Sequence, residues 1–170
     1  MKIMEIKHLA FLALSALLAS CAHNGDSDAG ASQASVGKPA PAWQEQTTTG
    51  KPLSMTSLHG KAVYLNFFAS WCPPCNEEAP DVNSLQTKYG AKGLQVVGVD
   101  VLENKEKAAY FVSEHHLKYP AVIDQGTLRD AYNVNGLPVH VFIDRQGVVR
   151  KILVGELSRS QMEAAVKSVL

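Results

Sequence analysis

The chain has 170 residues, of which 46% are hydrophobic, and its formal net charge at pH 7 is zero. That length and hydrophobic content suffice for one domain with a buried core. The balanced charge offers no basic surface of the kind that binds nucleic acid, and three cysteines are too few for a disulfide-rich scaffold.

The first twenty residues have the features of a signal peptide. Two lysines precede an apolar run over residues 9–19, which is too short to span a bilayer comfortably. The run ends in Leu18-Ala19-Ser20-Cys21, which resembles the bacterial lipobox. This resemblance implies cleavage before Cys21 and acylation of its sulfur, for example with palmitate. The alternative is an ordinary signal peptide with an incidental cysteine.

A polar segment follows the signal. Residues 22–35 are mostly Gly, Ser, Ala, Asn and Asp, a composition with little to bury that favours a flexible tether. We therefore divide the chain into a signal peptide (1–20), a lipidated cysteine with its tether (21–35) and one folded domain (36–170).

Hydrophobic periodicity and turn residues predict alternating strands and helices in the domain. The predicted strands are 61–68, 94–101, 121–123, 139–143 and 148–154. The predicted helices are 73–89, one that Asn104 caps, 128–132, and one that begins at Ser158 with Gln161 completing a capping box. The early strand–helix–strand order requires parallel crossovers, whereas the last two strands form a hairpin. An α/β fold with a mixed central sheet and helices on both faces satisfies this pattern.

The pair Cys72 and Cys75 stands at the junction between strand 61–68 and helix 73–89. Two intervening residues at the first turn of a helix let the sulfurs meet as a disulfide. The unpaired N–H groups and the positive dipole end of the helix favour a thiolate on the first sulfur. Cys72 is then the nucleophile, and Cys75 resolves the mixed disulfide. Half of a zinc site is the alternative, but no second CxxC follows.

Three stretches of the chain resemble the TlpA/ResA-like thiol–disulfide oxidoreductases, which have the thioredoxin fold. They are Val36-Gly37-Lys38-Pro39-Ala40-Pro41, the run Leu65-Asn66-Phe67-Phe68-Ala69-Ser70-Trp71-Cys72-Pro73-Pro74-Cys75, and Gly136-Leu137-Pro138 before Phe142-Ile143-Asp144. The resemblance covers about residues 36–170. It implies a thioredoxin-like fold and a redox-active disulfide between Cys72 and Cys75.

The resemblance also implies a substrate-binding surface beside the disulfide. The family proline that matches Pro138 is cis, and it would leave the backbone of Leu137 free to pair with an extended substrate. Trp71 would cover the disulfide and contact the substrate. A loop proline and a packing tryptophan are the structural alternatives.

Asn66 stands where classical thioredoxins carry a buried Asp, and an amide cannot exchange a proton during catalysis. Another acid is therefore needed. Glu78 matches a glutamate of ResA-like proteins and is our candidate general base for Cys75. Glu103 is similar to a second acid in the cleft of relatives, by a looser alignment. The default interpretation of His140 is a hydrogen-bonded core histidine.

Together these features predict an extracytoplasmic, membrane-anchored reductase of protein disulfides. The resemblance suggests cytochrome c maturation, with an apocytochrome disulfide as substrate and a membrane thiol carrier as electron donor. We expect a monomer that needs no cofactor and holds no metal. The alternatives are a periplasmic thiol oxidant or isomerase and, from another class, a Cu(I)-binding assembly protein that uses the same cysteines with His140.

Overall fold

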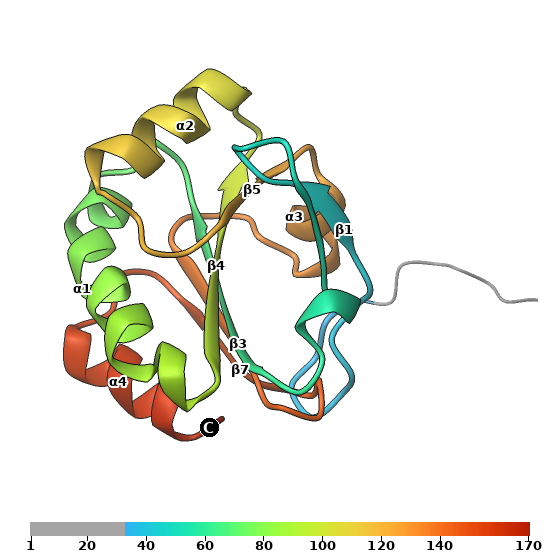
Figure 1. The fold of residues 1–170 in the computed structure, drawn as a ribbon. Helices are drawn as coiled ribbons and strands as arrows, with labels where there is room; N and C mark the ends of the chain where they lie inside the picture. The colour runs from blue at the N-terminus through green and yellow to red at the C-terminus, as the bar shows by residue number, and fades with distance from the viewer. Residues whose placement is uncertain (1–32) are drawn as a thin grey trace, which may run out of the picture.

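The computed structural model describes residues 33–170 and contains a five-stranded mixed sheet with strand order β5-β4-β3-β6-β7 (Figure 1). Parallel pairs join β3 to β4 and β4 to β5, whereas β6 pairs antiparallel with both β3 and β7. This is the thioredoxin-like mixed sheet that the sequence predicts. The strands are β3 (Ala62–Phe68), β4 (Leu94–Val101), β5 (Ala121–Asp124), β6 (Val139–Ile143) and β7 (Val149–Val154).

Helices cover both faces of the sheet (Figure 1). On one face α1 and α4 pack over the strands, around a core that includes Tyr64, Leu85 and Met162. On the other face α3 covers a second core, around Leu65, Val97 and Val141. The helices are α1 (Pro73–Tyr89), α2 (Lys105–Glu114), α3 (Thr127–Ala131) and α4 (Arg159–Lys167), with short 3-10 turns η1 (Thr56–Leu58) and η2 (Gly90–Lys92). No helix among residues 33–170 is long and apolar enough to cross a membrane.

The helix caps form where the sequence predicts them. The Asn104 side chain accepts the Lys107 N–H at the start of α2. Ser158 and Gln161 form the expected capping box of α4. These local interactions explain why both helix starts could be placed from the sequence.

Two features of the N-terminal part differ from the sequence prediction. A hairpin of β1 (Gln44–Gln46) and β2 (Pro52–Ser54) was not predicted, because strands of three residues show no clear alternation. In addition, the Ala34 N–H donates to the Ala131 carbonyl at 2.8 Å, so residue 34 already belongs to the folded part rather than to the predicted tether. Cys21 and the predicted signal peptide lie outside the described residues.

Strand register places three residues beneath the start of α1. Asn66, in the middle of β3, pairs with Gly98 of β4 on one side and with His140 of β6 on the other. The helix α1 begins shortly after β3, and its Val82 packs in one core cluster with Tyr64 of β3. Side chains from β3 and β6 can therefore reach residues on the inner face of α1.

Candidate active site

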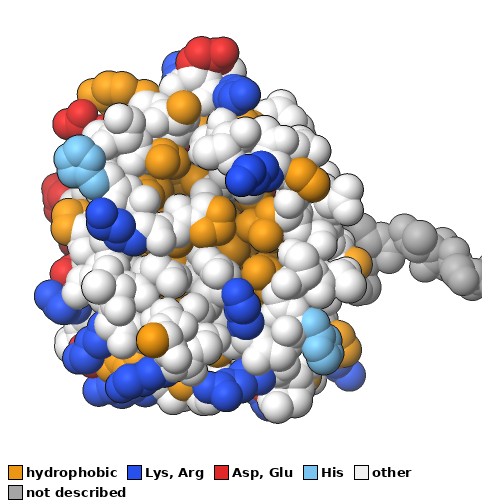
Figure 2. Space-filling model, viewed as in Figure 1, with side chains coloured by type: hydrophobic (Ala, Val, Ile, Leu, Met, Phe, Trp, Pro, Cys, Tyr) orange, Lys and Arg blue, Asp and Glu red, His pale blue; other side chains and the backbone are white. Residues whose placement is uncertain are grey.

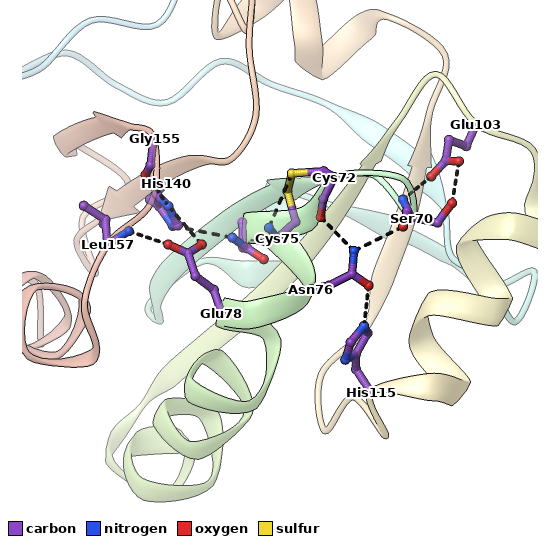
Figure 3. Close-up of a disulfide and its surroundings, with 11 residues drawn as sticks. Ser70, Cys72, Cys75, Asn76, Glu78, Glu103, His115, His140, Gly155 and Leu157 are labelled. Atoms are coloured by element: carbon purple, nitrogen blue, oxygen red, sulfur yellow. Dashed lines mark hydrogen bonds and ion pairs between the residues drawn. A yellow bond between two sulfur atoms is a disulfide. The ribbon is translucent and has the colours of Figure 1, made fainter.

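The first turn of α1 carries the two cysteines, joined as a disulfide with their Cα atoms 5.3 Å apart (Figure 3). Cys72 is the N-cap residue of the helix, and its sulfur accepts the Cys75 N–H at 3.4 Å. Pro73 and Pro74 fill the first two helical positions, where a missing N–H costs nothing. Both cysteines are buried, Cys72 at 3% exposed and Cys75 at 4%. The Cys75 N–H is thus the local donor to the Cys72 sulfur.

A hollow of about 240 Å³ lies next to Trp71, the residue before Cys72, and is lined by both apolar and polar side chains. Trp71 and Leu137 both line it, so the structure brings together two of the three residues predicted to bind substrate. Trp71 is 67% exposed, which is unusual for so large an apolar side chain. The peptide bond between Leu137 and Pro138 is cis, as the family resemblance implies. Leu102, also exposed, completes the apolar rim.

Asn76 fixes the loop that leads into the helix (Figure 3). Its side-chain amide donates to the Ser70 carbonyl at 3.1 Å and to the Cys72 carbonyl at 2.7 Å, and its oxygen meets His115 Nε2 at 2.8 Å. The loop is therefore held from both α1 and the end of α2. We did not predict this role, because no sequence motif marks it.

Glu78 lies one turn after Cys75 on the inner face of α1 and is only 4% exposed. One carboxylate oxygen, Oε1, accepts the Leu157 N–H, whereas Oε2 has no hydrogen-bond partner among the described residues. Burial raises the pKa of Glu78 to about 7; the Leu157 N–H opposes the shift, and nearby Glu156 and Asp81 add to it. The carboxyl can therefore both hold and release a proton near neutral pH.

His140 approaches Glu78 from β6 and is completely buried, as expected for a core histidine. Its Nδ1 lies 2.7 Å from the Tyr64 hydroxyl and its Nε2 lies 3.2 Å from the Gly155 carbonyl. The Nε2 atom is also 3.5 Å from Glu78 Oε2 (Figure 3). Burial lowers the pKa of His140 to about 4, so the ring is neutral at pH 7. The contact with Glu78 was not predicted.

Glu103 lies on the other side of the cysteines, just after the end of β4. Both of its oxygens accept hydrogen bonds from Ser70, one from the backbone N–H at 2.5 Å and one from the hydroxyl at 2.7 Å. The structure thus fastens this carboxylate to the loop before Cys72. Beneath it, Asp100 is fully buried, and neither of its side-chain oxygens has a partner among the described residues. Burial, reinforced by the Glu103 charge, raises the pKa of Asp100 to about 8.

Within residues 33–170, no group of three His, Cys, Asp or Glu side chains is placed to hold a metal ion. His140, the histidine that a copper site would need, has both ring nitrogens next to protein partners, Tyr64 and Gly155. Asn66 is buried beside it, with the amide nitrogen 3.5 Å from Nδ1, and contributes no charge. An acid with a pKa near neutral therefore lies on α1, at Glu78, whereas β3 contributes no acid.

Comparison with known proteins places this site in a family. Residues 35–170 match the Redoxin family model. Over 135 residues the chain is 36% identical to the thiol–disulfide oxidoreductase ResA of a Bacillus cereus strain, covering 79% of this chain and 78% of the relative.

Solved structures agree with this result. A thiol:disulfide interchange protein of the thioredoxin family from Chlorobium tepidum TLS is 33% identical, with a TM-score of 0.73 and coverage of 79% of this chain and 97% of its own. The exposed lipoprotein thioredoxin Etrx1 of Streptococcus pneumoniae strain TIGR4 is 27% identical, with a TM-score of 0.63, and covers 75% and 98%. The chain therefore belongs to the Redoxin family and is a thiol–disulfide oxidoreductase of the ResA type with Cys72 and Cys75 as its CxxC pair.

Proposed function

We propose that the protein reduces disulfides in other proteins and that Cys72 is the attacking residue. The observation that supports this most directly is the position of Cys72 at the N-cap of α1, where its sulfur accepts the Cys75 N–H. A helix N-terminus favours the thiolate over the thiol. Cys75 lies one turn further into the helix, and as the resolving thiol it needs access only to the Cys72 sulfur.

In the reduced enzyme the Cys72 thiolate attacks one sulfur of the substrate disulfide. The substrate S–S bond breaks, a mixed disulfide forms, and the second substrate sulfur leaves as a thiolate. Cys75 then loses its proton to Glu78 and attacks the Cys72 sulfur, which releases the first substrate sulfur as a thiolate. The substrate gains two electrons and the enzyme disulfide forms. A membrane thiol carrier would return the enzyme to the dithiol.

Glu78 suits the role of proton acceptor in the resolving step. Its pKa of about 7 lies near the operating pH, where a general base is most effective. Trp71 and Leu137 would hold an extended substrate segment along the hollow that they line, next to the cis bond between Leu137 and Pro138. Glu103, whose oxygens are both taken by Ser70, would fix the loop rather than move protons.

We infer that electrons flow from the enzyme to the substrate, because the site contains few groups that stabilise a thiolate. Pro73 and Pro74 have no backbone N–H, so the Cys75 N–H is the main local donor. A strong oxidant of this fold needs a much more stabilised reduced form. We expect a potential nearer the roughly −270 mV of thioredoxin than about −120 mV, measured by equilibration with a dithiol buffer. A value above about −180 mV would instead support an oxidant or isomerase.

Labelling and trapping test the assignment of the two cysteines. Iodoacetamide should modify Cys72 of the reduced protein much faster than Cys75, because Cys72 carries the more stabilised thiolate. Equal rates would refute the assignment. A Cys75→Ser variant should accumulate mixed disulfides, and the trapped protein identifies the substrate. We expect an apocytochrome c with a CxxCH disulfide, as the resemblance to ResA suggests; the Cys72→Ser variant, which should trap nothing, is the matched control.

We further propose that the protein is an extracytoplasmic lipoprotein anchored through Cys21. The support is the lipobox-like Leu18-Ala19-Ser20-Cys21 and the likeness to a pneumococcal thioredoxin that is an exposed lipoprotein. A Cys21→Ser variant should lose membrane attachment or processing and retain redox activity. Unchanged attachment in that variant would contradict the proposal.

A further inference from the structure

Glu78 and His140 meet across the interface between α1 and β6, and neither is explained by packing alone. Both side chains are buried, and Glu78 Oε2 has no hydrogen-bond partner among the described residues but lies 3.5 Å from His140 Nε2. A buried polar atom without a partner is costly. Whether Nε2, 3.5 Å away, presents an N–H group near this oxygen depends on which ring nitrogen of His140 carries the hydrogen.

The partners of His140 determine its tautomer. The Gly155 carbonyl, 3.2 Å from Nε2, can only accept a hydrogen bond, so Nε2 carries the hydrogen. Nδ1 is then an acceptor, and the Tyr64 hydroxyl donates to it at 2.7 Å. The Asn66 amide nitrogen, 3.5 Å from the same Nδ1, is also a donor and agrees with this arrangement. The Met162 sulfur, 3.4 Å from the Tyr64 hydroxyl, is a weaker acceptor than an imidazole nitrogen.

We propose that His140 is a positioning residue for Glu78: its Nε2 atom, which carries the hydrogen in the tautomer fixed by Tyr64 and Gly155, lies 3.5 Å from Oε2, and its N–H dipole orients the carboxylate for proton uptake from Cys75. This inference rests on the proposed role of Glu78 as the base. It places a second N–H group near the carboxylate, 3.5 Å from Oε2, besides the N–H that Leu157 donates to Oε1. A carboxylate that faces two donors ionises more readily than burial alone would allow.

The other ionisable groups around Glu78 do not change when His140 is replaced. The shift measured in a His140 variant therefore reports the loss of the imidazole rather than a new charge. These groups are Asp81 on α1, Arg159 of α4, which pairs with Asp81, Glu156 in the β7–α4 loop, Tyr64 on β3, and the two thiols of the reduced state.

The experiment compares three variants of β6 with the wild type. His140→Phe keeps a planar ring but has no donor, and His140→Gln restores an N–H. Val141→Ala is the matched control, because it loses core volume on the opposite face of the sheet. The carboxyl carbon of Glu78 is titrated by NMR in the oxidised protein. We expect the pKa to rise by about one unit in His140→Phe and to stay close to the wild-type value in the other two.

The rate of thiol exchange should change together with the pKa of Glu78. With a pKa about one unit higher, roughly a fifth as much Glu78 is ionised at pH 7, so resolution by Cys75 slows about fivefold and recovers above about pH 9. An unchanged or lowered Glu78 pKa in folded His140→Phe would overturn the proposal. If that variant does not fold, the ¹⁵N chemical shifts of His140 in the wild type test the proposal instead. A hydrogen on Nδ1 rather than on Nε2 would contradict the proposal. If the Glu78→Gln variant exchanged thiols at the wild-type rate, Glu78 would not be the base. The effect of His140 on the Glu78 pKa would still stand as measured.

Discussion

Two buried carboxyl groups lie on either side of the disulfide, and they differ in how their oxygens are occupied. Glu103 accepts a hydrogen bond from Ser70 at each oxygen, whereas Glu78 accepts one hydrogen bond, from the Leu157 N–H. The other oxygen of Glu78 has no hydrogen-bond partner among the described residues and lies 3.5 Å from His140 Nε2 (Figure 3). A fully occupied carboxylate fixes the backbone that binds it, while a half-occupied one remains free to exchange a proton. Burial alone does not distinguish a structural acid from a reactive one.

Their charged neighbours differ as well. Lys107 approaches Glu103 at 3.9 Å, whereas the charged groups that act on the pKa of Glu78 are the acids Glu156 and Asp81. The surface seen in Figure 2 carries apolar side chains near its centre, with most Lys and Arg side chains gathered toward the lower edge, away from α2. Desolvation therefore acts on Glu78 with little compensation from nearby positive charge, which is why its pKa is raised to about 7.

The largest effect should follow Glu78→Gln. The amide still accepts the Leu157 N–H but cannot take a proton from Cys75, so we expect exchange to slow about 100-fold at pH 7. Stability should stay the same or increase above pH 7: because the folded-state pKa of this acid is raised, its ionisation costs stability as pH rises. Stopped-flow exchange and urea unfolding measure the two quantities. Wild-type exchange rates would make Glu78 a structural acid like Glu103.

Glu103→Ala should lower stability more than it slows thiol exchange. It leaves the N–H and hydroxyl of Ser70 without their acceptors, which should lower the free energy of unfolding by about 1–3 kcal/mol. Exchange should slow far less than in Glu78→Gln. Glu103→Gln, which keeps one acceptor oxygen, is the control and should lose less stability. A rate loss in Glu103→Gln equal to that of Glu78→Gln would end the distinction between the two sites.

Asp100 sharpens the comparison, because it is buried with no hydrogen-bond partner among the described residues. Its raised pKa of about 8 means that the folded protein holds this proton where the unfolded chain has lost it, so stability falls as pH rises toward 8. We expect Asp100→Asn to reduce the fall between about pH 6.5 and 8 by about 1.5–2 kcal/mol. His140, whose pKa is lowered, acts at lower pH, outside this window. An identical pH profile in the variant would contradict the prediction.

Lys107→Ala should have the smallest effect. The ammonium lies 3.9 Å from Glu103, and the lysine side chain is 61% exposed, so solvent screens the pair. We expect a change in unfolding free energy below about 0.5 kcal/mol, because Ser70 supplies the hydrogen bonds to the carboxylate. A loss as large as that of Glu103→Ala would show that charge, rather than hydrogen bonding, fastens the loop.

The sequence predicted the main sheet and the principal helices because their signals are local. Apolar runs marked β3 and β4, and the caps Asn104 and Ser158 marked helix starts. The β1–β2 hairpin was missed because two three-residue strands carry too little pattern. Structures of such short strands depend on packing against the rest of the domain.

The site was only partly predictable for the same reason. The CxxC pair and Glu78 lie within seven residues of one another, so helical spacing sufficed to bring them together. His140 meets Glu78 only because β6 pairs beside β3 under α1, a contact between residues 62 positions apart. Asp100 did carry a signal, a lone acid in the apolar run of β4, which we did not interpret.

In the mechanism proposed above, the sulfur of Cys72 is both the atom that reacts and the atom that caps α1. Each change of its bonding partner, from thiolate to mixed disulfide to enzyme disulfide, therefore also changes the stability of the first helical turn. A cap contributes about 1 kcal/mol, which for a two-electron couple corresponds to about 20 mV. The stability of the helix and the reduction potential of the disulfide are thus thermodynamically linked in this protein. A substitution anywhere in α1 that stabilises or destabilises the start of the helix therefore also shifts the reduction potential.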